Sequence, residues 1–163
     1  MPVEIERAFV ADGEPDPALL GPGVLLRQGY VASEGEVEVR LRIRDDDAML
    51  TVKAGRGKVR TEVELPLSTE DAEALWPHTA GRRIVKRRHR VPLGGHVAEV
   101  DVYDGELAGL CRIEVEFTSP ELADGFEPPD WFGREVTGDD RWSNASLARH
   151  GRPDLDGGSD RDH

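Results

Sequence analysis

The sequence predicts a mainly β protein (α+β class), a closed antiparallel β-barrel with a few short helices on its outside. Three observations lead to this fold class. Apolar and charged residues alternate over most of the chain, short turn sequences separate the alternating runs, and like charges repeat within successive runs. A length of 163 residues suits one domain, which we place at residues 1–150.

Seven or eight strands are expected from the alternating runs. The clearest run is residues 35–44, in which apolar and charged side chains take turns, so that they fall on opposite faces of a strand. Turn sequences such as Gly55-Arg56-Gly57 and Gly94-Gly95 are short enough to close hairpins. The expected strands are residues 3–10, 27–33, 35–44, 48–54, 58–65, 83–91, 97–103 and 112–117.

Two helices and a tail complete the expected organisation. Ser68 is the expected N-cap of the first helix, with Asp71 placed like the acid of a capping box, and Pro77 ends it. A second short helix is expected after Asn144, ending at Gly151. Residues 151–163 are rich in Asp and Gly and lack apolar anchors, which predicts a disordered acidic tail.

Composition excludes several classes of protein. The net charge of −12 disfavours bulk binding of DNA or RNA, because such proteins are basic. We expect no membrane span, since no run approaches the ~20 apolar residues that one needs. The single cysteine, Cys111, excludes an intrachain disulfide and a multi-thiolate zinc site. These features predict a cytoplasmic protein, and they leave a homodimer open.

The charges are informative because they form like-charged pairs two residues apart, on one face of a strand. One such pair is ordinary on a wet sheet surface, but six pairs on successive strands indicate one shared surface. Carboxylates that hold a divalent metal, beside bases that hold a polyanion, would balance both kinds of pair. The pairs are Glu4/Glu6, Arg40/Arg42, Glu62/Glu64, Lys86/Arg88, Glu99/Asp101 and Glu114/Glu116, and Lys53 stands alone in its strand.

In order and spacing, these segments resemble the CYTH proteins, also called triphosphate tunnel metalloenzymes, over roughly residues 3–150. The first segment, Glu4-Ile5-Glu6-Arg7, resembles the start of the family's Glu-x-Glu-x-Lys signature. The other matching segments are residues 28–30, 39–42, 50–53, 62–64, 84–88, 99–103, 105–110, 114–117 and 131–139.

The resemblance implies an eight-stranded antiparallel tunnel that hydrolyses a small triphosphate with Mg²⁺ or Mn²⁺. The ending Trp131-Phe132-Gly133-Arg134-Glu135-Val136-Thr137 is most similar to the inorganic triphosphatases of the family. By this resemblance, Tyr30 would act near the attacking water or the terminal phosphate. The implied phosphate-binding residues are Arg40, Arg42, Lys53, Lys86 and Arg88, and the implied metal ligands are Glu4, Glu6, Glu62, Glu64, Asp101, Glu114 and Glu116.

One residue departs from the family signature, which has lysine where this chain has Ala8. A lost charge-assisted contact is worth roughly 1.5–3 kcal/mol, or about ten- to a hundredfold in binding or rate. Arg7 is not expected to compensate, because neighbouring residues of a strand face opposite sides. The alternatives to an inorganic triphosphatase are therefore a weakened enzyme that only binds triphosphate or polyphosphate, an adenylate cyclase and a thiamine triphosphatase.

Overall fold

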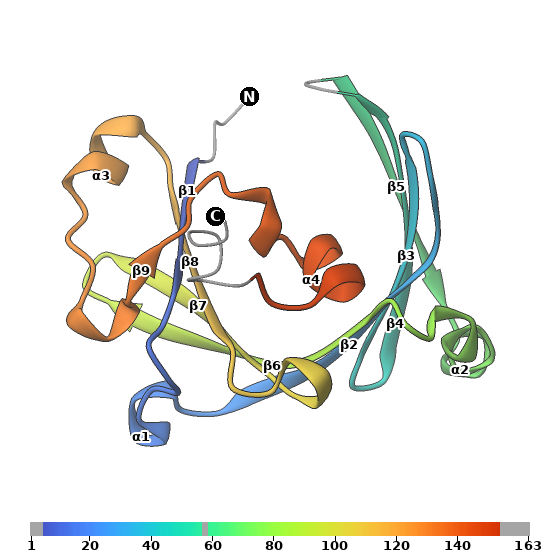
Figure 1. Ribbon diagram of the computed structural model, residues 1–163, viewed down its shortest axis with the longest axis horizontal. Helices are drawn as coiled ribbons and strands as arrows, with labels where there is room; N and C mark the ends of the chain where they lie inside the picture. The colour runs from blue at the N-terminus through green and yellow to red at the C-terminus, as the bar shows by residue number, and fades with distance from the viewer. Residues whose placement is uncertain (1–4, 57–58, 154–163) are drawn as a thin grey trace, which may run out of the picture.

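Sequential antiparallel hairpins build one strongly curved sheet in the computed structural model, which describes residues 5–56 and 59–153 (Figure 1). Its nine strands follow the order β5-β4-β3-β2-β6-β7-β8-β1-β9. The strands are β1 (Ile5–Val10), β2 (Gly23–Glu34), β3 (Val37–Arg44), β4 (Asp47–Arg56), β5 (Val59–Leu67), β6 (Arg83–Leu93), β7 (His96–Tyr103), β8 (Cys111–Phe117) and β9 (Arg134–Glu135).

Short helices connect and cover the strands. Helices α1, α2 and α3 lie outside the curve of the sheet, whereas α4 lies inside it (Figure 1). The α-helices are α1 (Pro17–Leu20), α2 (Thr69–Leu75), α3 (Pro120–Gly125) and α4 (Asn144–His150), and the 3₁₀ turns are η1 (Trp76–Thr79), η2 (Gly105–Leu107), η3 (Asp130–Phe132) and η4 (Asp140–Trp142). Within the described residues, no helix is long and apolar enough to cross a membrane.

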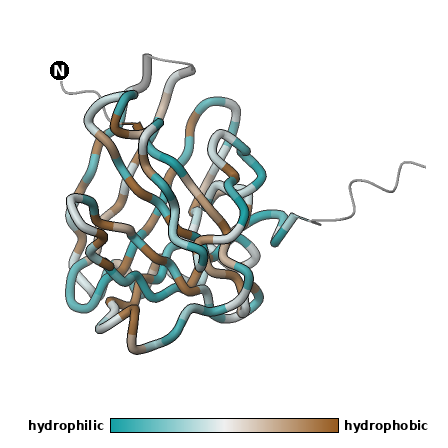
Figure 2. Tube along the Cα trace, turned by 90° about the vertical axis from the view of Figure 1, so that its left-hand side faces the viewer, coloured by the Kyte–Doolittle hydropathy of each residue, from teal (hydrophilic) through white to brown (hydrophobic). Residues whose placement is uncertain are grey.

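Alternation along the strands separates an apolar outer face from a charged inner face, as the sequence predicts. On β8, Ile113, Val115 and Phe117 belong to the outer core, which α1, α3 and η3 cover. Arg112 and Glu114 alternate with them and point to the inner side. The Cα trace shows the same alternation of apolar and polar residues on other strands (Figure 2).

The prediction of a closed eight-stranded barrel is wrong in two respects. The sheet has nine strands, and β5 and β9 stand at opposite ends of the strand order without pairing to each other in the described part of the chain. The physical reason is that β9 takes the free edge of β1, where Phe9 pairs with Glu135 and Val10 with Arg134. The hydrogen-bonding edge of β1 is therefore used there by a strand other than β5.

A glycine permits this close approach of β9 to β1. Gly133 adopts φ +76°, and a Cβ atom at this position would lie 2.3 Å from the carbonyl oxygen of Val10. Only glycine avoids both the strained backbone and the steric clash. We infer that Gly133 positions the final strand.

The prediction that the helices are outer elements is wrong for α4. Its Leu147 and Ala148 pack inside the curve with Tyr30, Tyr103 and Trp142, all of them buried. Helix α4 begins at Asn144, one residue earlier than expected, because Ser143 is the N-cap and accepts from the backbone of Ser146. Ala8, Val10 and Ile84 on the inner face at this end of the sheet are apolar, and they need a covering element.

The first predicted helix is confirmed. Ser68 Oγ accepts from the backbone N–H of Asp71 at 3.0 Å, which makes Ser68 the N-cap of α2. The α-helix ends at Leu75 and tightens into η1, which contains Pro77. The expected tail is described only to residue 153, so residues 154–163 lie outside the described residues.

We expect Cys111 to resist alkylation in the folded protein. Its side chain is fully buried in the outer core, and burial raises the pKa of the thiol to about 12. Thiolate is the reactive form, so little of it is present at pH 8. Labelling with iodoacetamide should be slow in buffer and complete in urea, and fast labelling of the folded chain would contradict this assignment.

Candidate functional site

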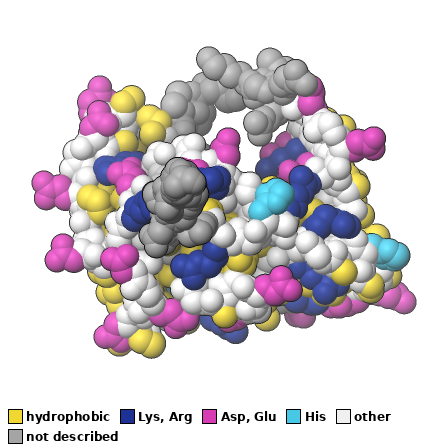
Figure 3. Space-filling view, in the orientation of Figure 1, with side chains coloured by type: hydrophobic (Ala, Val, Ile, Leu, Met, Phe, Trp, Pro, Cys, Tyr) yellow, Lys and Arg dark blue, Asp and Glu magenta, His cyan; other side chains and the backbone are white. Residues whose placement is uncertain are grey.

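The concave side of the sheet encloses a cavity of about 550 Å³. Basic and acidic side chains lie on the walls of the hollow between the two arms of the sheet (Figure 3). The chain is strongly acidic overall, so the bases are concentrated locally, which is what an anion-binding site in an acidic protein needs. The charged lining residues are the five arginines Arg40, Arg42, Arg44, Arg88 and Arg90 and the carboxylates Asp46, Asp47, Glu64 and Glu99.

Three of the five predicted phosphate-binding residues line this cavity, namely Arg40, Arg42 and Arg88. Lys53 and Lys86 are not among the described lining residues. Lys53 stands opposite Glu38 on β3 and Glu62 on β5. Arg44 and Arg90 also line the cavity and were not predicted, although each continues the alternation of a predicted basic pair by two residues.

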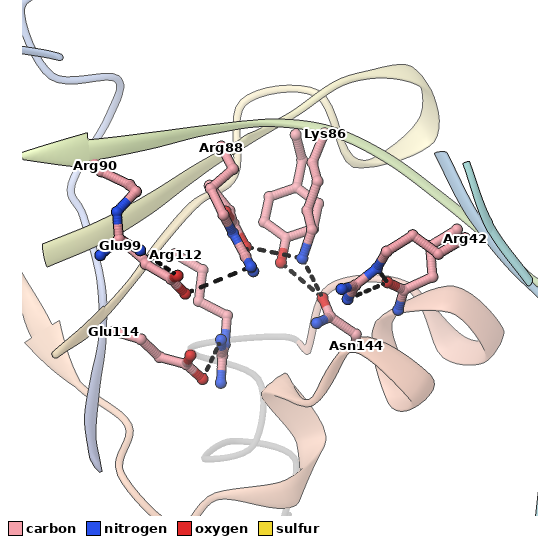
Figure 4. Close-up of polar contacts among 11 residues, drawn as sticks. Arg42, Lys86, Arg88, Arg90, Glu99, Arg112, Glu114 and Asn144 are labelled. Carbon is pink, nitrogen blue, oxygen red and sulfur yellow. Dashed lines mark hydrogen bonds and ion pairs between the residues drawn. The ribbon is translucent and has the colours of Figure 1, made fainter. Parts of the chain in front are cut away.

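Lys86 and Arg88, which lie near each other on β6 (Figure 4), share the carboxylate of Asp101 in an ionic network, in which Lys86 and Asp101 are buried and Arg88 is partly buried. The Lys86 ammonium lies 2.8 Å from Asp101 Oδ2, and Arg88 donates to both carboxylate oxygens at 2.8 and 3.0 Å. Burial lowers the pKa of Lys86 to about 8, although Asp101 opposes the shift. Burial would raise the pKa of Asp101, but its two cationic partners outweigh burial and lower it. In this structure Asp101 is thus the counterion of two bases.

Asn144 of α4 extends this network, and the sequence analysis did not find it. Its Oδ1 atom accepts from the Tyr103 hydroxyl at 2.9 Å and from Lys86 Nζ at 3.3 Å. Lys86 is consequently fully buried beneath the start of α4. A residue at a helix start carries no periodic signal, so only the folded arrangement places Asn144 here.

Arg42, Gln28 and Tyr30 form a second inner-face network. Arg42 donates to Gln28 Oε1 through Nε at 3.0 Å and Nη2 at 2.8 Å, and Gln28 Nε2 donates to the Tyr30 hydroxyl at 3.1 Å. Burial raises the pKa of Tyr30, so its phenol stays protonated at neutral pH. Tyr30 can therefore hold a hydrogen bond near the cavity, and its assignment as a catalytic residue stays a prediction.

Carboxylates of the two paired strands β1 and β8 lie next to one another on the sheet. Glu6 stands directly opposite Glu116, and Glu114 of β8 stands opposite both Ala8 of β1 and Glu99 of β7. Burial and, next, the Glu114 carboxylate raise the pKa of Glu6. Neighbouring carboxylates that disfavour each other's charge are a suitable donor set for a hard divalent cation.

The structure tests the predicted metal ligands only in part. In the described ranges, no group of three or more His, Cys, Asp or Glu side chains has a geometry ready for a metal. Glu4 lies outside the described residues. Glu62 and Glu64 lie on the exposed edge strand β5, in the far arm of the sheet from β1 (Figure 1). The full ligand set stays a prediction.

Two curated relatives match almost the whole chain, and both carry the name inorganic triphosphatase. The one from Nitrosomonas europaea is 42% identical over 89% of this chain and 96% of its own length. The one from Acetivibrio thermocellus is 35% identical over 90% of this chain and 94% of its own length. The chain belongs to this family, the triphosphate tunnel metalloenzymes. No family model matches it.

Solved structures agree with membership of the triphosphate tunnel metalloenzymes. A crystal structure of an inorganic triphosphatase superposes with a TM-score of 0.78 at 38% identity, over 94% of this chain and 99% of that chain. A putative adenylyl cyclase from Hippeastrum, described as having a dominant triphosphatase activity, has a TM-score of 0.56 at 16% identity. The second comparison supports the fold alone.

On strand β1, this triphosphate tunnel metalloenzyme has Ala8 at the position where the family signature has lysine. Ala8 is buried on the inner side with Val10 and Tyr30. Arg7 faces the opposite side, where it pairs with Glu135 at 2.9 Å and donates to the carbonyl oxygens of Ala123 and Phe126. Arg7 therefore does not replace the missing lysine, as the sequence analysis expected.

Proposed function

We propose that this chain is a divalent-metal-dependent hydrolase of inorganic triphosphate. The observation that carries the proposal is the cavity of about 550 Å³ with five arginines on its wall. Guanidinium groups suit bidentate contacts with phosphate oxygens, and several together offset the charge of a triphosphate. The names of the two curated relatives support this choice of substrate.

The arginines would hold the triphosphate extended through the cavity and neutralise charge on the leaving phosphate oxygens. Water oxygen forms a bond to the terminal phosphorus while the bridging P–O bond breaks, which gives diphosphate and phosphate. Phosphoryl transfer depends mainly on positioning and electrostatics, so no nucleophilic side chain is needed. Gln28 would keep Arg42 oriented toward the substrate.

The residues that would hold Mg²⁺ or Mn²⁺ are Glu6, Glu114 and Glu116, together with Glu4. The fit rests on the carboxylate chemistry of this set and on the raised pKa of Glu6 beside Glu114. When bound, the ion would supply positive charge to phosphate oxygens and lower the pKa of a bound water. Glu62, Glu64 and Asp101 remain further proposed ligands.

Phosphate release from inorganic triphosphate tests this function. We expect release with Mg²⁺ or Mn²⁺ and its loss in excess chelator, with slower release from ATP and thiamine triphosphate. Adding Mg²⁺ that contains no Zn²⁺ back to the metal-free protein should restore phosphate release. This step controls for irreversible damage by the chelator. Release that is unaffected by the chelator would contradict the metal dependence, and a better rate with either organic triphosphate would contradict the substrate.

Ala8 favours a second candidate, a protein that binds triphosphate without turnover. This candidate predicts that triphosphate raises the melting temperature while no phosphate is released. It also predicts that Ala8→Lys gains a rate that the native chain lacks. Production of cyclic AMP from ATP would instead favour the cyclase.

A further inference from the structure

We propose that Arg112, which lies on the concave face of the sheet beside the residues that line the cavity, is a further phosphate-binding residue, an inference that rests on the proposed function. Arg112 projects from the inner face of β8, and its side chain is only 13% exposed. One end of its guanidinium group is occupied, because Nη1 donates to Glu114 Oε2 at 2.9 Å. Its Nε donor is buried and has no hydrogen-bond partner.

A buried guanidinium donor without a partner is unfavourable, because its hydration is lost and nothing replaces it. Arg42 and Arg88 use Nε together with Nη2 to bind an acceptor side-on. The same edge of Arg112 has no acceptor at Nε. Arg40, which lines the cavity, also has a buried Nε without a partner. Arg40 on β3 and Arg112 on β8 lie in opposite arms of the curved sheet, so the inner face carries an unsatisfied guanidinium donor on each side, which indicates that an anion binds between them.

The position of Arg112 fits a contact with the same anion that Arg88 would hold. Both side chains project toward the same space, with Glu99 and Glu114 beside them (Figure 4). Burial lowers the pKa of Arg88, whereas Asp101, then Glu99 and last Glu114 raise it. Burial also lowers the pKa of Arg112, and Glu114 is the main group that raises it, so the Glu114 carboxylate lies within electrostatic range of both arginines. A phosphate bound to Arg88 can therefore draw the Arg112 guanidinium into the cavity and give Nε its acceptor.

Arg112 also supplies the charge that its neighbouring strand lacks. Among the described inner-face residues of β1 and β8, Arg112 is the cation, while Glu6, Glu114 and Glu116 are acidic. Val10 stands opposite Arg112, and Ala8 stands opposite Glu114. These short side chains leave room for the guanidinium group. A polyanion beside the carboxylates of β8 needs a cation on this side, and the geometry gives it Arg112.

Calorimetric titration of chelator-treated protein with inorganic triphosphate tests this proposal apart from turnover. We expect Arg112→Met to weaken binding about ten- to a hundredfold, the value of a charge-assisted contact. Arg112→Lys should lose less, and Ala8→Lys should restore affinity to the Arg112→Met chain. Arg87→Met is the matched control, because Arg87 is an exposed arginine on the outer face of β6 and should bind like the native chain.

Unchanged affinity in Arg112→Met, with a native far-UV spectrum, would overturn the proposal and leave Arg112 as a counterion of Glu114. If Arg112→Met does not fold, the neutral and polar Arg112→Gln chain decides, and wild-type affinity in that folded chain would also overturn the proposal. Native protein that binds triphosphate through Arg112 but releases no phosphate would contradict the proposed function and support this inference. Absence of any binding would overturn both.

Discussion

Replacing Asp101 with asparagine should lower the free energy of unfolding by about 3–5 kcal/mol, because it breaks a buried ion pair from one side. Lys86 is fully buried and Arg88 is mostly buried, and both depend on this carboxylate. Asparagine keeps the shape of the side chain, so the loss reports the missing charge rather than a cavity. Urea unfolding followed by circular dichroism gives the midpoint and slope.

Two further variants separate charge from packing in this experiment. Glu99→Gln is the matched control, since Glu99 lies on the same face of β7 but is 30% exposed, and it pairs with the exposed Arg90 at 3.0 Å and more distantly with Arg88 at 3.5 Å. Its loss should stay below about 1 kcal/mol. Adding Lys86→Met to Asp101→Asn should recover part of the loss, because it removes the uncompensated charge. A loss below about 1 kcal/mol for Asp101→Asn alone would show that water reaches the ammonium group.

Periodicity predicted which face each side chain takes, because a two-residue period is a local property of a strand. Arg40 and Arg42 reach the cavity for this reason. Closure of the sheet into a barrel, by contrast, is not a local property of any one strand. The two-residue strand β9 is too short to carry any period, and the long connection after β8 brings it to the edge of β1. Neither the ninth strand nor the open sheet could be read from alternation.

The positions of the inner-face charges were predictable where like charges repeat and were missed where charges differ. Arg112 alternates with Glu114, so a search for like-charged pairs passes over it even though it shares the inner face. Asn144 reaches Lys86 only because α4 folds into the concave side of the sheet. Tertiary packing, rather than any local pattern, decides such contacts.

The proposed function requires a chain of net charge −12 to bind a polyanion, and the acidic and basic groups in this cavity would allow this. Surface carboxylates repel the ligand at long range, but salt screens this repulsion beyond about 8–10 Å. Inside the curve, Asp101 orients Arg88 and Gln28 orients Arg42, so the guanidinium groups are already in place. Preorganised donors lose little freedom when the ligand arrives.

Changing Glu6 to glutamine should separate stability from activity. Without metal, we expect the free energy of unfolding to stay the same or rise by about 0.2–1 kcal/mol, because like charges directly opposite on paired strands are destabilising. Under the proposed function, phosphate release should nevertheless fall by about a hundredfold or more, since a metal held by Glu6 would contribute several kcal/mol to charge stabilisation. Mg²⁺ should raise the melting temperature less than it does in the native chain.

The opposite pattern would identify Glu6 as a structural residue: lower stability with retained phosphate release. Glu127→Gln is the matched control, because Glu127 is an exposed carboxylate between α3 and η3 and should change neither quantity. Thermal unfolding with and without Mg²⁺, run beside the phosphate assay, gives both readouts on the same protein. A carboxylate that opposes folding and supports turnover is retained for the ligand it binds, and this is the physical signature that separates a metal ligand from an ordinary surface charge.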